Sequence, residues 1–313
     1  MTESPPTIRD LRMARKRISG YLHVTPVFTS SAINRLAGAE VFFKCENLQK
    51  TGAFKIRGAV NAVFSREKGP DFATHSSGNH AAALALAARW RGVQAHIVMP
   101  ENSPGVKKDA VSGYGADIHF CQPTLKARER MLEEVVSRTG AVFVHPYDDP
   151  LVISGQGTAA LELLEEVSGL DTLITPVGGG GLLSGTAIAT GAVSPSTAVM
   201  AAEPAGADDA YRSLKSGRLI PSENPDTIAD GLLTSLSELT FGIIRDKVSG
   251  IVRVSEQGII NAMRLIWERM KLVIEPSAAL PLGALVESRG SIPGTRIGII
   301  LSGGNVDLEN LPF

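Results

Sequence analysis

The chain is poor in cysteine and carries almost no net charge. Its 313 residues include only two cysteines, Cys45 and Cys121, and both lie in apolar segments. Two reduced, buried thiols therefore explain them better than a disulfide or a metal site. The formal net charge is −1 and no basic block stands out, which argues against nucleic acid or a membrane surface as a partner. We expect a small-molecule partner instead.

Long apolar runs are also lacking. No stretch is long and apolar enough to cross a bilayer, and the first residues contain no apolar signal segment, so we expect a cytoplasmic location. The hydrophobic content of 43% and the charged content of 20% are ordinary for a globular protein. A chain of this length can form one large or two moderate domains.

What the sequence does contain is a regular alternation of short β-rich runs with helical patterns. Several runs are nearly continuous in valine, isoleucine and leucine, as is typical of strands buried on both faces of a parallel sheet. We expect strands at residues 41–45, 95–99, 117–121, 142–145, 172–177, 199–203, 252–254 and 297–301. We expect helices at residues 81–90, 125–138, 158–167, 181–190, 256–270 and 277–287. The alternation predicts an α/β fold of doubly wound type.

A strand and helix series of its own occupies residues 71–148. We interpret this region as a small domain inserted into a larger one, which is formed by residues 1–70 and 149–313.

One lysine stands out by its position. Lys55 follows a predicted strand and opens a helical pattern within the segment FKIRGA. A lysine that is partly desolvated at the end of an element can lose its proton and attack a carbonyl group. Most lysines are solvated surface charges, however, so position alone does not make Lys55 catalytic.

Two glycine-containing segments favour the binding of an anion. The segment HSSGNH, residues 75–80, opens an alanine-rich helix whose first amides lack helical partners, although such a segment on its own is more often an ordinary helix cap. Glycines 178–181 lie between a strand and a helix, where their amides can closely approach one phosphate. They match neither the Walker A nor the dinucleotide pattern.

Polar side chains mark two further segments. Ser302 ends the last apolar strand and can exchange a hydrogen bond with a heterocycle nitrogen, although a turn is the simpler explanation. Glu203 and Asp209, with a backbone carbonyl between them, suit a hard divalent cation. A solvated acidic loop is the common alternative.

Taken together, these motifs resemble the fold-type II family of pyridoxal-phosphate enzymes, and within it the serine racemases and short serine/threonine dehydratases. The segments FKIRGA, HSSGNH, HPYDDP, GQGT, PVGGGG, AAEP, ERMKLVIEPSAA and LSGGNVD follow the family's order over nearly the whole chain. The resemblance implies two α/β domains like those of the tryptophan synthase β subunit, with the cofactor in the cleft between them.

The resemblance also implies a cofactor site. Lys55 would hold pyridoxal 5'-phosphate as a Schiff base, with Phe54 beside the ring. Asn79 would bond the ring hydroxyl, and Ser302 would contact the pyridine nitrogen. The phosphate would be held by Gly178, Gly179, Gly180, Gly181 and Leu182.

Substrate contacts are implied in the same way. The substrate carboxylate would be held by Ser76, Ser77, Asn79 and His80. Ser77 would be a second acid–base group on the ring face opposite Lys55. Arg128 matches an arginine that can face a second, distal carboxylate, but it would otherwise be a solvated helix charge.

Two further ligands follow from the resemblance. Glu203, the carbonyl of Ala207, and Asp209 match a site for Mg²⁺, Mn²⁺ or Ca²⁺. ATP is a possible activator at a homodimer interface, since matching positions are Ser30, Ser31, Lys50, Thr51, Tyr114, Lys271 and Asn305. Ala82 stands where a glutamine contact is expected, which leaves ATP regulation open.

The implied reaction is β-elimination from serine or threonine to a keto acid and ammonia, with amino-acid racemisation as a second outcome. A serine at the pyridine nitrogen makes the ring a moderate electron sink, which favours elimination. A 3-hydroxyaspartate dehydratase or an aspartate racemase is the alternative, because Tyr147 and Asp148 resemble the microbial dehydratases. A catalytically silent protein that binds pyridoxal phosphate is an alternative of another class.

Overall fold

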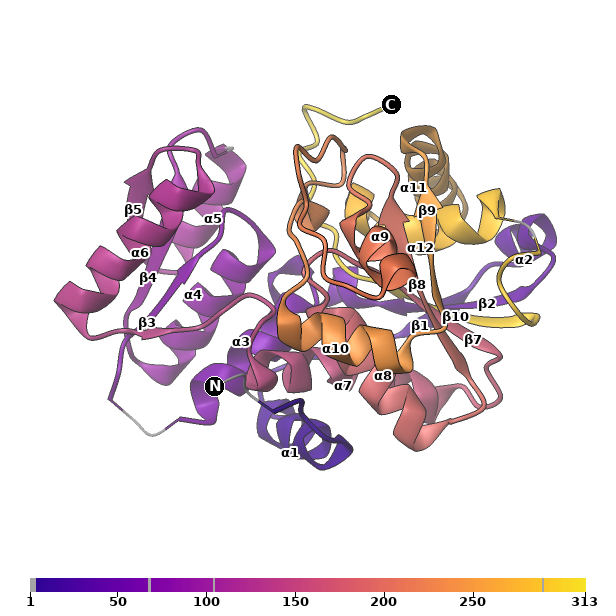
Figure 1. Ribbon diagram of the computed structural model, residues 1–313, viewed down its shortest axis with the longest axis horizontal. Coiled ribbons are helices and arrows are strands. Elements are labelled where there is room, and N and C mark those ends of the chain that lie inside the picture. The colour runs from indigo at the N-terminus through magenta and orange to yellow at the C-terminus, as the bar shows by residue number, and fades with distance from the viewer. Residues whose placement is uncertain (1–3, 67–68, 104, 289) are drawn as a thin grey trace.

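Two sheets of unequal size form the framework of the chain (Figure 1). The computed structural model describes residues 4–66, 69–103, 105–288 and 290–313. The larger sheet contains β1 (Val27–Thr29), β2 (Glu40–Cys45), β7 (Thr172–Pro176), β8 (Ala198–Pro204), β9 (Gly250–Val254) and β10 (Arg296–Leu301). The smaller sheet contains β3 (Phe72–His75), β4 (Ala95–Pro100), β5 (Asp117–Cys121) and β6 (Val142–Phe143).

Strand order and direction match an open α/β architecture. The larger sheet runs β1-β2-β10-β7-β8-β9, and the smaller runs β5-β4-β3-β6. Neighbouring strands pair in parallel in both sheets, except that β1 is antiparallel to β2 at the edge. The predicted α/β fold with mainly parallel sheets is therefore confirmed.

Helices cover both faces of each sheet. They are α1 (Ile8–Ile18), α2 (Ser31–Ala37), α3 (Lys55–Phe64), α4 (Asn79–Arg91), α5 (Gly105–Gly113), α6 (Leu125–Thr139), α7 (Pro150–Glu166), α8 (Gly181–Val193), α9 (Asp209–Ser216), α10 (Glu238–Lys247), α11 (Glu256–Met270) and α12 (Pro276–Glu287). Short 3₁₀ helices are η1 (Glu46–Leu48), η2 (Lys50–Gly52) and η3 (Asp230–Leu232).

Alternation along the central strand β10 explains these layers. Ile299 belongs to the apolar cluster with α2, α11 and α12, whereas Ile300 belongs to the cluster with α1, α7 and α8. Successive side chains of a strand point to opposite faces, so a strand of continuous isoleucine and leucine supports a helix layer on each side. The smaller sheet is covered in the same way by α4 on one face and α6 on the other.

All eight predicted strands are present, with ends that shift by at most two residues. The predicted start of one helix at residue 158 is wrong, because α7 begins at Pro150. Asp149 caps it by accepting hydrogen bonds from the amides of Leu151 (2.7 Å) and Val152 (3.3 Å). Two glycines, at positions 155 and 157, lower the helix propensity of this stretch and conceal it in the sequence.

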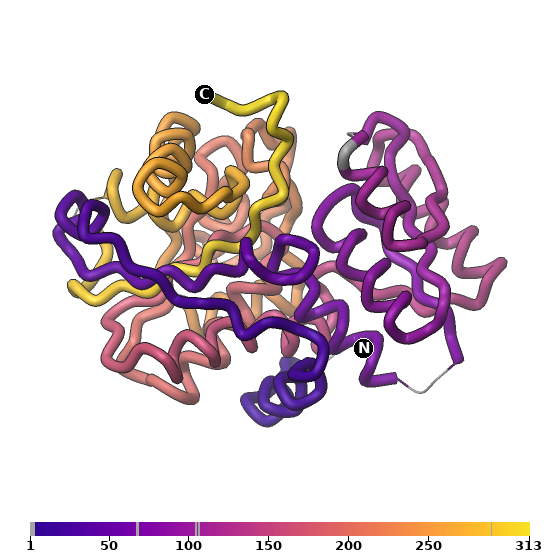
Figure 2. The backbone as a smooth tube through the Cα atoms, turned by 180° about the vertical axis from the view of Figure 1, so that it is seen from behind, coloured from indigo at the N-terminus to yellow at the C-terminus, as the bar shows by residue number. Residues whose placement is uncertain are grey.

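The two sheets belong to separate lobes, as the view from behind also shows (Figure 2). We call β3–β6 with α4, α5 and α6 the smaller lobe, and the remaining elements the larger lobe. We propose that the domain boundaries follow this division, with residues 71–148 forming the smaller domain. No helix in the described part of the chain is long and apolar enough to cross a membrane.

Candidate active site

Lys55 is the first residue of α3, where the larger lobe meets the smaller one. The segment before it pairs with the segment after β10: Ala53 bridges Gly303, and the amide of Phe54 donates to the Ser302 carbonyl at 3.0 Å. The Lys55 Nζ donates to the Pro146 carbonyl at 2.9 Å and lies 5.2 Å from the centre of the Phe54 ring. The fold thus brings the lysine and Ser302 to one place.

The charge of Lys55 is controlled by its surroundings. Burial lowers the pKa of this amine to about 8, against the opposing effect of the negative charge on Glu275. A substantial part of the amine is therefore neutral near physiological pH, which is the form that attacks a carbonyl carbon.

Glu275 is a site residue that the sequence reasoning missed. Its buried carboxylate accepts both hydrogen bonds from the Asn79 side-chain amide, at 2.9 and 3.1 Å. Burial raises the pKa of Glu275 to about 7, although the bonds from Asn79 act in the opposite direction. The only signal in the sequence was an acidic residue before Pro276 in an otherwise apolar segment.

Ser302 offers a polar atom toward a ligand. Its side chain is 2% exposed, and within the described ranges its Oγ has no hydrogen-bond partner. A buried hydroxyl usually finds a partner, so this atom suits a bond to a ligand nitrogen. The next residue must be glycine, because a Cβ at Gly303 would lie 2.6 Å from a Glu275 oxygen.

The tetraglycine links the C-terminal end of β7 to α8, on the side of the larger sheet where β10 also ends. Gly180 has a φ of 85°, in the left-handed region that glycine favours. The first hydrogen bond of α8 runs from the Ser184 amide to the Gly180 carbonyl (2.8 Å), so the amides of residues 181–183 lie at its N-terminus. Such amides bind phosphate well.

Side chains other than hydrogen would not fit in this turn. A Cβ at Gly179 would lie 2.2 Å from the Tyr147 ring, and one at Gly181 would lie 2.5 Å from the Gln156 side-chain oxygen. The glycines therefore serve both the close packing behind the turn and the open approach in front of it.

The loop at residues 76–78 connects β3 to α4 in the smaller lobe. Asn79 begins α4, and its side-chain oxygen accepts a hydrogen bond from the Asn305 amide at 2.9 Å. Ser76 and Ser77 are partly exposed. The ring of His80 is buried against the Val144 carbonyl (3.2 Å), which leaves its backbone amide, at the start of the helix, for a ligand.

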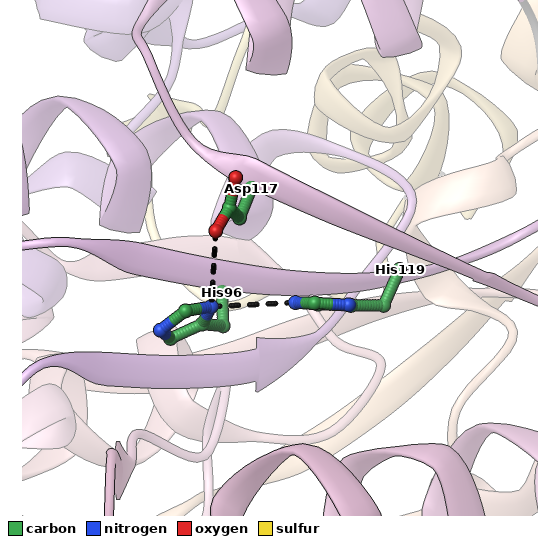
Figure 3. A group of neighbouring side chains, drawn as sticks. All are labelled: His96, Asp117 and His119. Carbon is green, nitrogen blue, oxygen red and sulfur yellow. Dashed lines mark hydrogen bonds and ion pairs between the residues drawn. The ribbon is translucent and has the colours of Figure 1, made fainter. Parts of the chain in front are cut away.

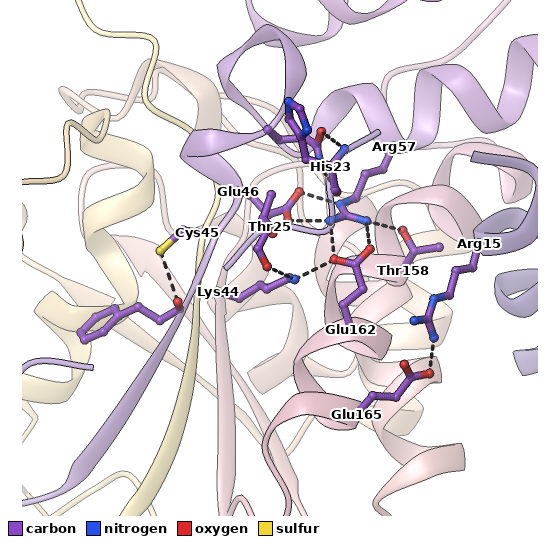
Figure 4. Close-up of polar contacts among 12 residues, drawn as sticks. Arg15, His23, Thr25, Lys44, Cys45, Glu46, Arg57, Thr158, Glu162 and Glu165 are labelled. Atoms are coloured by element: carbon purple, nitrogen blue, oxygen red, sulfur yellow. Dashed lines mark hydrogen bonds and ion pairs between the residues drawn. The ribbon is translucent and has the colours of Figure 1, made fainter. Parts of the chain in front are cut away.

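Behind Lys55, a buried ion network anchors α3 (Figure 4). Arg57 bonds Glu46 at 2.6 and 2.8 Å and Glu162 at 2.7 Å through two nitrogens. Lys44 completes the network with a 2.6 Å ion pair to Glu162. Burial alone would raise the pKa of Glu162, but the bonds from Arg57 lower it. The network holds the helix that carries Lys55.

Arg128 lies on α6, close enough to His75 and Tyr147 for its charge to act on both. The pKa of His75 is lowered mainly by burial and further by the positive charge of Arg128. Burial raises the pKa of Tyr147 to about 12, and the charge of Arg128 slightly opposes this rise. Its Nε is buried, and no hydrogen-bond partner occurs among the residues whose positions are described. This nitrogen is therefore available to donate a hydrogen bond to an anion.

Two buried carboxylates lie near the end of β8. Both oxygens of Glu203 accept amide hydrogen bonds, from Ala210 (2.8 Å) and Tyr211 (2.7 Å). Glu203 and Asp209 are each 1% exposed, and Asp209 Oδ2 has no hydrogen-bond partner in the described part of the chain. Ala207, which lies between them, is also buried. Two buried carboxylates beside a backbone carbonyl are suitable ligands for a hard cation.

A lysine with a lowered pKa, a turn suited to an anion and a buried hydroxyl without a partner in the described ranges together suit a cofactor that has a carbonyl group, a phosphate and a ring nitrogen. The fold and the site thus define an α/β enzyme that uses pyridoxal phosphate. The chain belongs to the family of pyridoxal-phosphate dependent enzymes, whose sequence profile matches residues 18–303.

Individual relatives cover nearly the full chain. Serine racemase of Dictyostelium discoideum is 51% identical over 97% of this chain and 96% of its own, and its crystal structure matches with a TM-score of 0.92. The beta-hydroxyaspartate dehydratase of Paracoccus denitrificans is 48% identical over 98% of this chain and 99% of its own. A pyridoxal 5'-phosphate-dependent aspartate racemase is 37% identical over 100% of this chain and 99% of its own, with a TM-score of 0.94.

Proposed function

We propose that this enzyme converts small hydroxy-amino acids, such as L-serine and L-threonine, to a keto acid and ammonia by β-elimination. We infer that racemisation at the α-carbon is a second outcome at the same site. The proposal depends on one observation: the segment that carries Lys55 is hydrogen-bonded to the segment that carries Ser302, whose buried hydroxyl has no partner among the described residues. Relatives that are racemases and dehydratases support both outcomes.

Pyridoxal phosphate, when bound, withdraws electrons from the α-carbon of an amino acid and makes its hydrogen acidic. We propose that the neutral Lys55 Nζ accepts this proton, and that Ser302 holds the ring nitrogen with a hydroxyl. A hydroxyl stabilises positive charge less than a carboxylate does, which favours prompt loss of a β-substituent over a long-lived carbanion. Phe54 is assigned to the ring face, and Asn79 to the ring hydroxyl.

We assign the substrate carboxylate to the start of α4. Ser76, Asn79 and the amide of His80 would hold it, at the positive end of a helix dipole. Ser77 is proposed to exchange a proton on the opposite face from Lys55. Returning a proton there inverts the α-carbon, whereas loss of the β-hydroxyl gives elimination.

A panel of serine, threonine and both 3-hydroxyaspartate diastereomers tests the proposal by keto-acid release and chiral analysis. Lys55→Ala should lose both reactions, and full turnover in this variant would overturn the assignment. Ser77→Ala should lose racemisation while it keeps elimination from the L-enantiomer. Equal loss of both reactions would make Ser77 a binding residue. Cofactor binding without turnover of any panel member would favour a silent binding protein.

A dicarboxylic substrate is the second candidate, and Arg128 is the observation that favours it. The buried Nε of Arg128, which has no partner among the residues that the structure describes, suits a distal carboxylate, which guanidinium binds in a bidentate manner. Arg128→Gln should raise the KM for 3-hydroxyaspartate about tenfold or more, as expected for losing a charge-assisted bond, and leave the KM for serine nearly unchanged. Equal effects on both substrates would exclude this candidate. Arg130→Gln, an exposed arginine on the same helix, is the matched control.

We further propose that Glu203, Ala207 and Asp209 bind Mg²⁺, Mn²⁺ or Ca²⁺. A cation would compensate the two buried negative charges. Chelation should then lower the melting temperature, and added Mg²⁺ should restore it. The same response in Asp209→Asn would show that the cation binds elsewhere.

ATP activation and a homodimer complete the proposal. A cavity of about 710 Å³ is lined by Thr51, Tyr114 and Asn305, which match the expected nucleotide contacts. Tyr114→Ala should abolish any activation by ATP if the cavity is its site, whereas activation that persists in this variant would place the nucleotide elsewhere.

We propose that exposed apolar side chains of the larger lobe meet a second copy of the chain. These side chains are 42–72% exposed, and they are Val24, Phe28, Leu48 and Val273. Hydrogen bonds from His23 to Gln49 and from Asn47 to Val273 hold these segments together. A charged substitution, Phe28→Asp, should shift the chain toward monomer in light scattering, and an unchanged mass would exclude this face.

A further inference from the structure

A cluster of two histidines and an aspartate lies across β4 and β5 of the smaller sheet (Figure 3). His96 is near the start of β4, while Asp117 and His119 are in the first half of β5. The loop at residues 76–78 follows the C-terminal end of β3, whereas the cluster lies toward the N-terminal ends of the neighbouring parallel strands. Nothing in the proposed reaction uses this cluster.

Strand register brings the three side chains together. His96 pairs with Asp117 across the parallel ladder, and His119 lies two residues further along, on the same face as Asp117. The His96 Nδ1 is 3.3 Å from His119 Nε2 and 3.6 Å from an Asp117 oxygen. One ligand atom from each residue lies within 4.8 Å of the other two.

These separations resemble those between the ligands of a tetrahedral metal ion. Zinc bonds to nitrogen and oxygen are about 2.0–2.2 Å long, and a regular tetrahedron then has edges of roughly 3.3–3.6 Å. A hydrogen bond between the two histidines would explain their contact with each other. It would not explain why the Asp117 carboxylate lies 3.6 Å from His96, which is beyond hydrogen-bonding distance. Three potential ligands therefore converge, and only one pair of them is at hydrogen-bonding distance.

The other nitrogen of His96 supports the same interpretation. Its Nε2 lies 3.8 Å from an Asp71 oxygen, and Asp71 is itself fixed by the Gln94 amide at 2.9 Å. The side chain of His96 is 8% exposed, and in the part of the chain that the structure describes Nε2 has no hydrogen-bond partner. A carboxylate facing Nε2 favours the tautomer with a proton there, which leaves Nδ1 as the ligand atom.

We propose that His96, Asp117 and His119 bind a borderline divalent transition metal, with Zn²⁺ as the preferred ion. Two imidazoles and a carboxylate suit zinc, whereas Mg²⁺ and Ca²⁺ prefer oxygen ligands alone. The Asp117 side chain is 65% exposed, so the ion enters from solvent and keeps water as its fourth ligand. By joining β4 to β5, the metal stabilises the smaller lobe.

The test uses the untagged holoenzyme in excess Mg²⁺. Calorimetric titration with ZnCl₂ measures zinc binding, and thermal unfolding with and without ZnCl₂ measures stabilisation. We expect a zinc-dependent rise in melting temperature in the wild type that His119→Ala and Asp117→Asn both lose. His23→Ala, which removes an exposed histidine of the larger lobe, should retain it. Zinc binding and stabilisation that persist in His119→Ala would overturn the proposal.

Two further readouts separate this site from adventitious binding. Co²⁺ in place of Zn²⁺ should give the intense visible bands of tetrahedral coordination, and these bands should be absent in His119→Ala. Asp71→Asn keeps an oxygen for the Gln94 amide but loses the charge that faces His96. It should weaken zinc binding roughly 10- to 100-fold, as expected for an outer-shell partner. An unchanged affinity would show that Nδ1 of His96 is not the ligand atom.

Discussion

At the scale of single residues, the site depends on an amine whose protonation is set by burial. The pKa of Lys55 is lowered to about 8 because the folded chain surrounds its charged form with little water. The role proposed for Lys55, as the residue that would hold the cofactor, requires the neutral amine. The rate at which the apoenzyme takes up pyridoxal phosphate should therefore rise with pH and level off above about 8.

Stopped-flow absorbance of the bound cofactor across a pH series measures this dependence. A midpoint close to 10.5, the ordinary pKa of a lysine, would contradict the assigned environment of Lys55.

Glu275 provides a second prediction for the same amine. Its negative charge favours protonated Lys55 and thereby raises the lysine pKa. Glu275→Gln removes the charge but keeps a side-chain oxygen for the Asn79 amide, so the midpoint of cofactor uptake should move to lower pH. Asp246→Asn, which changes an exposed carboxylate, should leave the midpoint where it was. A shift toward higher pH in Glu275→Gln would reverse the proposed electrostatics.

At the scale of elements, the close packing of α7 against α8 holds the phosphate turn in place. A Cβ at Gly185 would lie 2.6 Å from the Gly157 amide nitrogen and 2.6 Å from the Ile153 carbonyl. Gly185→Ala should therefore destabilise the protein by about 1–3 kcal/mol, because the helices must move apart. Denaturant unfolding of the holoenzyme measures the change.

The same helix offers a matched control. No atom of the described residues outside the helix lies within 4 Å of a Cβ at Gly191, so Gly191→Ala should be neutral or stabilise the helix by up to about 1 kcal/mol. Equal effects of the two substitutions would show that interhelical contact is not the cause.

At the scale of the whole molecule, polar contacts join the smaller lobe to the larger one. Asn79 of the smaller lobe bonds Glu275 and Asn305 of the larger lobe, and Lys107 pairs with Asp230 across the cavity. The Asp230 side chain is 52% exposed, so this ion pair contributes little to global stability.

Asp230→Asn should change the free energy of unfolding by less than about 1 kcal/mol, yet loosen the attachment of α5 to the larger lobe. Hydrogen exchange measured by mass spectrometry should rise in α5 and stay unchanged in α8. Adding Lys107→Ala to this variant should have no further effect, since the pair is already broken. A further rise in the double variant would mean that Lys107 is held by another group.

Most of the framework could be predicted from the sequence because buried parallel strands are almost wholly apolar. β1 and β3 escaped prediction, since they have three and four residues and include polar positions. Short strands depend on their neighbours in the sheet, so periodicity along the chain cannot reveal them. The start of α7 was concealed by its own glycines, which the packing against α3 and α8 requires.

The sequence by itself determined the α/β class and marked Lys55, the tetraglycine and Ser302, because each needs a particular residue type at an element boundary. Only the tertiary structure placed Glu275 beside Asn79, which lies 196 residues away, and brought His96 to Asp117 and His119. The physical reason is that packing joins parts of the chain that are distant in sequence. Glu275 and Asn79 stand at the starts of helices in different lobes, and His96 meets Asp117 and His119 through the pairing of β4 with β5, so neither contact leaves a local pattern in the sequence.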